Sequence, residues 1–339
     1  MFIYISLLSI FFVYAMIDLV NIYIPTKAKN SQLTFLLIVL FFFTAFTKGI
    51  GFDVDAYSDY DIISNVTTTE PFFEWLYFIL KSPQEVRLVT SLICVVLFGI
   101  LIKRTSPLYF ISLYMLLTSF VLMYMMGVLR QAIAIAIILS SWRLCMNKKI
   151  LFIINVAIAS LFHNSAIVAI LYVFLPKNRL YSKKGLLIIS VFSLVLFFVF
   201  INLMGYLAGG MIDVSGKLNH YNTSDLDTKP SIPLFLYRLF IVYLLYACGI
   251  GKDNSLLANA FILSLFMSLA LSASSTIGGR LVVYFSITDI LVVPMLLNNC
   301  PRLLRFPIGL LILLINGYLY FSFLNGFKDE YIPYYNWLF

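Results

Sequence analysis

Long, almost unbroken runs of hydrophobic residues dominate the chain, and polar residues gather in the loops between them. We predict eleven membrane segments from these runs, at residues 2–22, 32–47, 85–102, 106–126, 128–146, 150–175, 185–204, 232–249, 255–275, 280–298 and 306–325. Apolar runs of about 18 residues or more are typical of transmembrane helices, whereas transmembrane β-strands give short alternating segments. The pattern therefore predicts an all-α, polytopic transmembrane helical bundle that forms one integral membrane domain over residues 1–339.

Composition narrows the class of protein further. Hydrophobic residues make up 62% of the chain and charged residues 11%, with a mean hydropathy of +0.99, which excludes a soluble fold. The first apolar run has no basic region before it, so we expect it to stay as a helix rather than be cleaved as a signal peptide. The four cysteines form no Cys-x-x-Cys pair, and the net charge of +8 is not gathered into long basic runs. We therefore expect no metal site, no disulfide framework and no nucleic-acid partner.

Lysines and arginines in the short loops predict the orientation, because they collect on the cytoplasmic side of a membrane. Alternation of the first five segments puts the N-terminus outside and places three basic loops inside, with Lys27 and Lys29, Lys103 and Arg104, and Arg143, Lys148 and Lys149. If residues 150–175 crossed once, the next loop, with four basic residues between 177 and 184, would lie outside. That arrangement conflicts with the rule.

A break within residues 150–175 removes the conflict. His163 and Asn164 interrupt this otherwise apolar segment near its middle. Two halves of about 12 residues span about 18 Å each, too short for about 30 Å of hydrocarbon, and broken helices at such depth need protein or an aqueous cavity around them. We therefore predict a re-entrant hairpin with His163 at its tip, facing an external aqueous pocket. The alternative is a straight helix with a hydrogen-bonded interior histidine.

Besides Arg87 and Asp289, three arginines lie within or at the outer ends of predicted membrane segments, namely Arg130, Arg238 and Arg280. Charge at the centre of a membrane helix costs about 2.5–3.5 kcal/mol on insertion scales and often marks function. The predicted orientation puts all three at or just below the external surface. Together they suit an anion with phosphate oxygens, which guanidinium groups bind through paired hydrogen bonds. The alternative is that each extends separately to lipid headgroups.

The predicted external stretch 48–84 combines carboxylates with aromatic rings, including Asp53, Asp55, Tyr57 and Glu70. Such a set is typical of carbohydrate sites, where carboxylates bind hydroxyls or act as acid and base. The alternative is a solvated acidic loop followed by an interfacial amphipathic helix at "FFEWLYFIL".

Several short motifs occur in an order that resembles the EpsG family of bacterial exopolysaccharide and O-antigen polymerases, the Wzy type. They are Gly51-Phe-Asp53-x-Asp55-x-Tyr57, Glu70-Pro71-x-Phe73, Leu129-Arg130-Gln131-x-x-Ala134, Phe162-His163-x-Ser165-Ala166, Arg280-x-x-x-Tyr284 and the tail "YIPYYNWLF". The resemblance covers nearly the whole chain. Lys48 departs from it, because many relatives are expected to have arginine there.

The resemblance implies a glycosyltransferase of GT-C-like architecture in the bacterial cytoplasmic (inner) membrane, with its active site facing the periplasm or cell exterior. It would transfer a growing glycan from undecaprenyl pyrophosphate to the non-reducing end of a new lipid-linked repeat unit. No metal or other cofactor is implied. The partners implied are the lipid-linked oligosaccharide substrates and membrane lipid, with a chain-length regulator and a flippase as further candidates.

The motif positions imply catalytic roles for Arg130, His163 and Arg280. We expect Arg130 and Arg280 to bind the pyrophosphate, and His163 to act as the base or to orient the acceptor; an external carboxylate is the alternative base. Residues expected to bind substrate are Gln131, Arg238, Tyr284, Asp53, Asp55, Tyr57 and Glu70.

Two other activities fit the same sequence features. A flippase for lipid-linked oligosaccharides would also hold pyrophosphate with membrane arginines, but it should show repeat symmetry and gates on both faces, which this sequence does not. A membrane acyltransferase would place its histidine near the cytoplasmic face, whereas the predicted topology puts His163 toward the outside.

Overall fold

A computed structural model describes residues 1–51, 70–208, 232–272 and 275–336 of the 339-residue chain. Within the described residues it is helical, apart from an isolated antiparallel bridge between Thr47 and Asn336. The chain divides into two compact units, one formed by Met1–Val173 with Asp289–Phe339 and the other by Phe174–Thr288. The single domain predicted for residues 1–339 stays a prediction.

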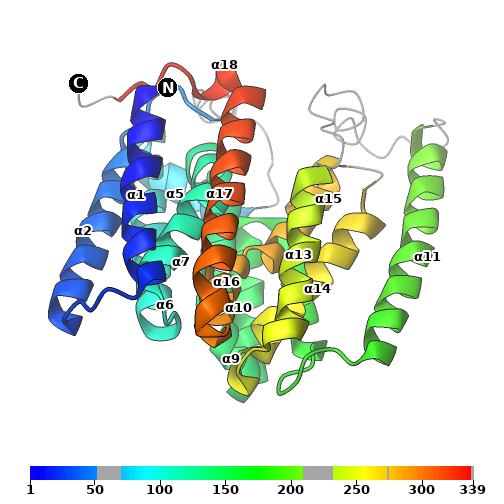
Figure 1. The fold of residues 1–339 in the computed structure, drawn as a ribbon. Helices are drawn as coiled ribbons and strands as arrows, with labels where there is room; N and C mark the ends of the chain where they lie inside the picture. The colour runs from blue at the N-terminus through cyan, green and yellow to red at the C-terminus, as the bar shows by residue number, and fades with distance from the viewer. Residues whose placement is uncertain (52–69, 209–231, 273–274, 337–339) are drawn as a thin grey trace. The chain divides into compact units, whose positions relative to one another are not determined.

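The first unit contains most of the helices (Figure 1). In chain order they are α1 (Phe2–Val20), α2 (Thr26–Ala45), α5 (Pro71–Leu80), α6 (Pro83–Thr105), α7 (Tyr109–Leu116), the π-helix η1 (Leu117–Gly127), α8 (Leu129–Ser140), α9 (Trp142–Asn147), α10 (Lys149–Phe162), the 3₁₀-helix η2 (Asn164–Phe174), α16 (Asp289–Asn299), α17 (Arg302–Gly326) and α18 (Lys328–Tyr331). Helix α1 packs against α7 and α17, α2 packs against α6, and α8 contacts both α6 and α10.

The second unit contains α11 (Lys183–Ala208), α13 (Ile232–Cys248), the 3₁₀-turn η3 (Lys252–Asn254), α14 (Ser255–Ala270) and α15 (Ser275–Ser286). Helix α14 contacts α11, α13 and α15. The buried side chain of Asn259 in α14 donates hydrogen bonds to the carbonyls of Pro176 and Arg179 and accepts one from the Tyr181 amide. One amide side chain thus holds the loop before α11 against the centre of the unit.

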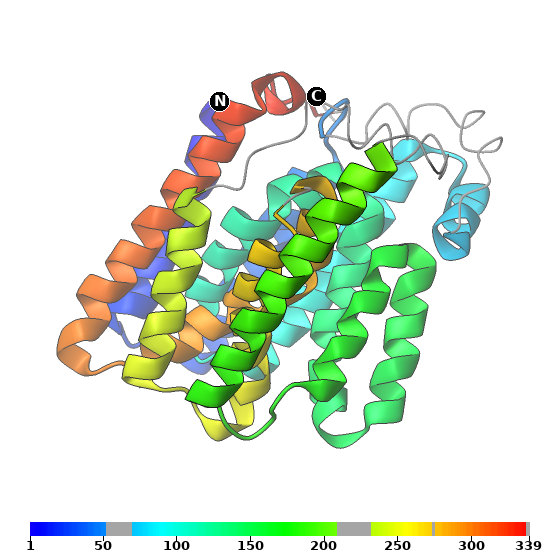
Figure 2. The same ribbon diagram turned by 90° about the vertical axis from the view of Figure 1, so that its right-hand side faces the viewer.

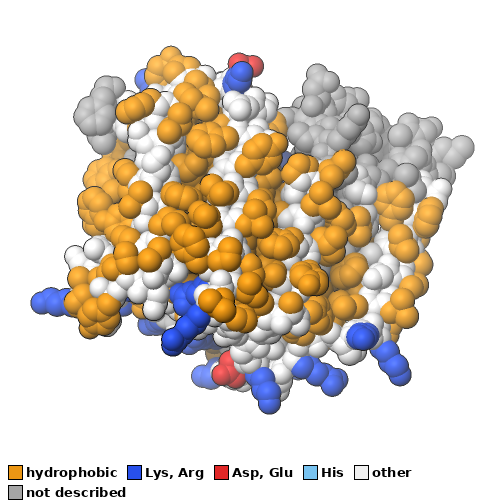
Figure 3. All heavy atoms as spheres, in the orientation of Figure 1, with side chains coloured by type: hydrophobic (Ala, Val, Ile, Leu, Met, Phe, Trp, Pro, Cys, Tyr) orange, Lys and Arg blue, Asp and Glu red, His pale blue; other side chains and the backbone are white. Residues whose placement is uncertain are grey.

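The fold is that of a multi-pass membrane protein. Among the described residues, seven helical stretches are long and apolar enough to span a membrane, and five more are shorter apolar helices. Helix α2 buries Leu36 and Leu40 but exposes Phe35, Ile38 and Phe42 on its other side, so both of its faces are apolar. Figure 3 shows hydrophobic side chains covering the flanks of α1, α2 and α17, with Lys and Arg at the lower ends of these helices. A helix that is apolar on all sides is typical of a membrane-spanning segment, where one side packs against protein and the other contacts lipid.

Each predicted membrane segment overlaps a helix in the structure, although several are interrupted. The predicted segment 128–146 comprises α8 and α9, which meet at Ser141, and 106–126 changes from α-helix to π-helix at Leu117. Helix α5 forms within the predicted external stretch 48–84, and it contains the segment "FFEWLYFIL" that the alternative interpretation predicted to be helical. That eleven segments enter the membrane, and that their architecture is of the GT-C type, remain predictions.

The predicted break at His163 is confirmed. Helix α10 ends at Phe162, His163 has an extended backbone with φ −155° and ψ 118°, and η2 begins at Asn164. The rings of Phe152 and Tyr172, ten residues before and after Phe162, lie 5.9 Å apart. Because residues symmetric about the break touch, the two halves run antiparallel and form a helical hairpin, visible as two neighbouring short helices at the right of Figure 2. The straight-helix alternative is therefore wrong.

The C-terminal tail closes one end of the first unit. The Tyr331 hydroxyl donates to the Leu122 carbonyl, and the Tyr331 carbonyl accepts from the Tyr4 hydroxyl at 2.6 Å. The Tyr334 ring stacks on Phe43 with centroids 5.2 Å apart. These buried hydrogen bonds hold the tail against both α1 and η1.

Candidate functional site

Three motif residues from distant parts of the sequence meet in the first unit. Oε2 of Glu70 accepts a 2.7 Å hydrogen bond from Nη1 of Arg130 within an ion pair, and Oε1 lies 2.6 Å from Nδ1 of His163. The backbone amide of Asn164 adds a third, longer hydrogen bond of 3.3 Å to the same carboxylate. We call Glu70, Arg130 and His163 the hairpin-tip cluster, because Glu70 joins the tip of the hairpin to the start of α8.

Local structure explains why each side chain reaches this point. Glu70 precedes Pro71, and proline is favoured in the first turn of a helix, so α5 begins directly after the carboxylate. Arg130 lies in the first turn of α8, which begins anew after the π-helix η1 ends at Gly127. His163 lies at the break of the hairpin. All three therefore occupy helix ends, where the backbone can direct a side chain toward a common point.

An apolar layer supports the cluster. Phe73, Tyr77, Val86 and Leu129 form a buried group in which the helices α5, α6 and α8 meet, and Phe162 packs against it. The Phe162 ring also meets Phe72 edge-to-face, with centroids 5.5 Å apart. Phe162 precedes His163 directly, so this packing fixes the position from which the histidine extends.

Burial and charge act in opposite directions on Glu70, which is only 5% exposed. Desolvation raises the pKa of its carboxyl, but the hydrogen bond from His163, the charges of Arg130 and His163, and the Asn164 amide together lower it below its ordinary value of 4.5. Glu70 is therefore ionised at neutral pH. The amide of Asn164 opens η2, and an anion is stabilised at such a helix N-terminus.

The ionised carboxylate determines the tautomer of His163. A carboxylate only accepts hydrogen bonds, so Nδ1 of His163 carries a proton, and in the neutral ring Nε2 keeps its lone pair. Nε2 is buried and has no hydrogen-bond partner among the described residues. Buried polar atoms in proteins are nearly always hydrogen-bonded, so an unpaired one points to a group that binds there.

Arg130 is the accessible cation of the cluster. Its side chain is 27% exposed, against 7% for that of Glu70. Gln131, the next residue, is almost fully buried at 1% exposure in the first turn of α8. The arrangement thus offers a partly exposed guanidinium, an oriented imidazole and a carboxylate that binds both.

Apart from Gln131, the remaining predicted site residues lie either in the second unit or outside the described residues. Arg238 on α13 and Arg280 on α15 belong to the second unit, as does Tyr284, which lies one turn after Arg280 and is buried. Their convergence with Arg130 on one anion stays a prediction. Asp53, Asp55 and Tyr57 lie outside the described residues. Within the described part of the chain, no group of three His, Cys, Asp or Glu side chains is arranged to hold a metal ion.

Sequence reasoning did not assign a role to Arg87, which organises the backbone beside the cluster. This arginine is 6% exposed and donates hydrogen bonds to Thr47 Oγ1 at 2.9 Å, the Met126 carbonyl at 2.8 Å and the Ile50 carbonyl at 3.2 Å. It links residues 47–50, which lead to the motif that begins at Gly51, with Met126 near the end of η1, four residues before Arg130. The available signal was a charged residue within a predicted membrane segment, because Arg87 lies four residues after the start of α6.

Gly51 belongs to the same junction. Its backbone has φ +107°, and a Cβ there would lie 2.2 Å from the Met126 carbonyl oxygen. Only glycine fits such a conformation and approach. The first glycine of the motif is therefore needed for the contact between residues 47–51 and the end of η1.

Comparison with known proteins agrees with the motifs. No curated protein and no solved structure matches the chain. The EpsG family model matches residues 30–336, a range that includes the hairpin-tip cluster, Arg87, Arg238 and Arg280. Membership of this family indicates a role in exopolysaccharide synthesis. With a match over nearly its whole length and a multi-pass helical fold, the chain belongs to the EpsG family.

Proposed function

We propose that this protein is a Wzy-type polymerase that joins lipid-linked oligosaccharide repeat units. The observation that carries the proposal is the hairpin-tip cluster, in which Glu70 orients His163 so that Nε2 is left without a described partner beside the cationic Arg130. A transfer between sugars needs a base for the attacking hydroxyl and positive charge for the leaving group. The cluster supplies both.

The proposed step proceeds as follows. The hydroxyl at the non-reducing end of the acceptor attacks the anomeric carbon of the donor, and its proton passes to Nε2 of His163. The bond between that carbon and the undecaprenyl pyrophosphate oxygen breaks, and its electron pair stays on the pyrophosphate. Arg130 binds the developing charge, and Arg280 from the second unit is the second cation that we propose. Glu70 stabilises the imidazolium that forms.

The geometry favours His163 over Glu70 as the base. Glu70 is ionised, but its oxygens are engaged by Arg130, His163 and the Asn164 amide, and its lowered pKa makes it a weak base. Nε2 of His163 is buried in this state. The segment that covers it must therefore move when the acceptor binds, as active-site segments do in many enzymes. Gln131, Arg238, Tyr284, Asp53, Asp55 and Tyr57 remain candidates for binding the sugars or the carrier.

We propose that the reaction takes place at the outer face of the bacterial cytoplasmic membrane. The basic residues of the short loops support this orientation, and it puts the hairpin tip toward the outside. The substrates would be undecaprenyl-pyrophosphate-linked oligosaccharides in the membrane. A flippase and a chain-length regulator are the proposed protein partners.

The product in a strain without the gene distinguishes a polymerase from a flippase. A polymerase defect leaves single repeat units attached on the outer surface, whereas a flippase defect traps them inside. Complementation of this strain with variants then tests the role of each residue. Wild-type protein should restore the full ladder of polymers, and so should the control Glu85→Gln, which changes an exposed carboxylate of α6. His163→Ala and Arg130→Gln, at matched protein levels, should leave single units. A full ladder with His163→Ala would remove the base role from this residue.

A further inference from the structure

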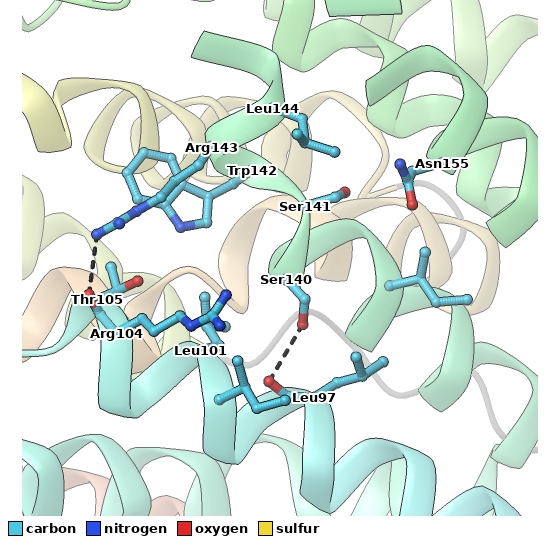
Figure 4. A pocket seen from close by; sticks show the side chains of 12 residues that line it. Leu97, Leu101, Arg104, Thr105, Ser140, Ser141, Trp142, Arg143, Leu144 and Asn155 are labelled. Atoms are coloured by element: carbon cyan, nitrogen blue, oxygen red, sulfur yellow. Dashed lines mark hydrogen bonds between the residues drawn. The ribbon is translucent and has the colours of Figure 1, made fainter. Parts of the chain in front are cut away.

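A pocket that includes none of the residues of the hairpin-tip cluster is lined by two arginines, Arg104 and Arg143. This pocket of about 480 Å³ lies where α6, the junction of α8 and α9, and α10 meet. Figure 4 shows its walls: Leu97 and Leu101 come from α6, Ser140 from α8 and Asn155 from α10. This volume is within the range of small-molecule sites.

Arg104 supplies the charge of this pocket. Its guanidinium extends into the pocket toward Ser140 in Figure 4. Among the described residues, no hydrogen bond or ion pair engages that guanidinium. The backbone carbonyl of Arg104 accepts a 3.1 Å hydrogen bond from Nη2 of Arg143, and the Arg143 guanidinium also lies 5.5 Å from the Trp142 ring. Arg143 and Trp142 thus hold the end of α6 in place, while Arg104 is left to bind a ligand.

The lining is positive and amphipathic. Its residues include two arginines and no Asp or Glu, together with the apolar side chains of Leu97, Leu101 and Ile137. An apolar track leads to it along α6, where Leu92, Val96 and Ile100 are spaced four residues apart and are 46%, 47% and 45% exposed. Such a track is suited to the acyl chain of a lipid, and the arginine at its end is suited to the phosphate in the headgroup of the same lipid.

We propose that this pocket binds the phosphate headgroup of an anionic glycerophospholipid, with an acyl chain lying along the exposed face of α6. Basic pockets between membrane helices are known sites for such headgroups, and arginine binds phosphate oxygens through paired hydrogen bonds. The pocket lies at the end of α6 that carries Lys103 and Arg104, the end that the loop charges assign to the cytoplasm. The site does not depend on the polymerase reaction.

Native mass spectrometry of the purified full-length protein tests this proposal. The protein is equilibrated in nanodiscs with equal parts phosphatidylglycerol and phosphatidylcholine, and the lipids that it retains are counted. Wild-type protein should retain phosphatidylglycerol preferentially. Arg104→Gln should lower that retention about tenfold, as expected for the loss of a charge-assisted contact. The matched control is Lys103→Gln, which removes the same charge from an exposed neighbour that does not line the pocket.

Further arms identify the ligand and guard against misfolding. Ile100→Glu puts a carboxylate on an exposed position that lines the pocket, so it should also lower phosphatidylglycerol retention. Millimolar inorganic phosphate should leave the retained lipid in place, whereas displacement would identify a site for free phosphate and overturn the lipid proposal. Equal losses in Arg104→Gln and Lys103→Gln, or equal retention of phosphatidylcholine, would also overturn it.

Discussion

Replacing Glu70 by glutamine tests how the hairpin-tip cluster works. The substitution keeps the size of the side chain and removes its charge. It also gives the side chain an N–H₂ group, which can donate to Nδ1 of His163. That pairing favours the tautomer with the proton on Nε2, and His163 then cannot act as a base from that nitrogen.

The size of the effect follows from the contacts of Glu70. The hydrogen bonds at 2.6 Å and 2.7 Å to His163 and Arg130 are both charge-assisted. Weakening contacts of this kind costs about 1.5–3 kcal/mol each, and Arg130 is 27% exposed, which moves its contribution toward the lower figure. We expect a total loss of stability of about 3–4.5 kcal/mol. Loss of general-base catalysis should lower the rate of glycan transfer about 10²–10⁴-fold.

The assay is single-turnover transfer in liposomes that contain purified protein and lipid-linked repeat units. Glu70→Gln should bind the donor at least as well as wild type, because Arg130 no longer pairs with a carboxylate, while the transfer step slows. The control is Glu85→Gln, whose carboxylate is exposed on α6. Combining Glu70→Gln with His163→Ala should cost no more than His163→Ala alone, since both changes act on one unit. A folded Glu70→Gln protein that transfers glycan at the wild-type rate would refute the reasoning.

Three further predictions follow from the same region. Gly51→Ala should destabilise the protein by about 3 kcal/mol or more, because it adds a Cβ 2.2 Å from the Met126 carbonyl oxygen. Gly49 has φ +64° and open space around it, so Gly49→Ala should cost only about 1–2 kcal/mol. Thermal unfolding of the two variants in detergent measures the difference. Arg87→Met should cost about 2–6 kcal/mol by leaving two buried carbonyls without their donor, and Lys103→Met on the same helix should change the unfolding temperature little. The pKa of Glu70 is lowered, so its ionised form stabilises the fold above pH 4.5 and this stabilisation is lost as the pH falls through the lowered pKa; an acid titration of unfolding should show the loss in wild type and not in Glu70→Gln.

Much of the helical fold could be predicted from the hydrophobic pattern, because apolar runs of membrane length have few alternatives to a helix. The break at His163 could also be predicted, since basic residues on both sides of residues 150–175 require its two ends to lie on the same face. The change to a π-helix at Leu117 and the interruption at Ser141 could not. Both depend on how neighbouring helices pack, and the apolar sequence there carries no local signal for them.

The candidate site could be predicted only in part. His163 and Arg130 were expected to act together, whereas Glu70 was expected to contact substrate from an external loop. Glu70 is 93 residues from His163 and 60 from Arg130, and no local pattern links residues at such separations. Arg87 was missed as an organising residue because its three acceptors are backbone carbonyls and a hydroxyl, which any sequence supplies.

The most direct test of the central claim is a cryo-electron-microscopy structure of the protein with a lipid-linked repeat unit bound. The account predicts pyrophosphate oxygens within about 3 Å of the Arg130 guanidinium, and an acceptor hydroxyl at hydrogen-bond distance from Nε2 of His163. Pyrophosphate bound instead at the opposite helix ends, beside Arg104, with the hairpin-tip cluster unchanged, would contradict it.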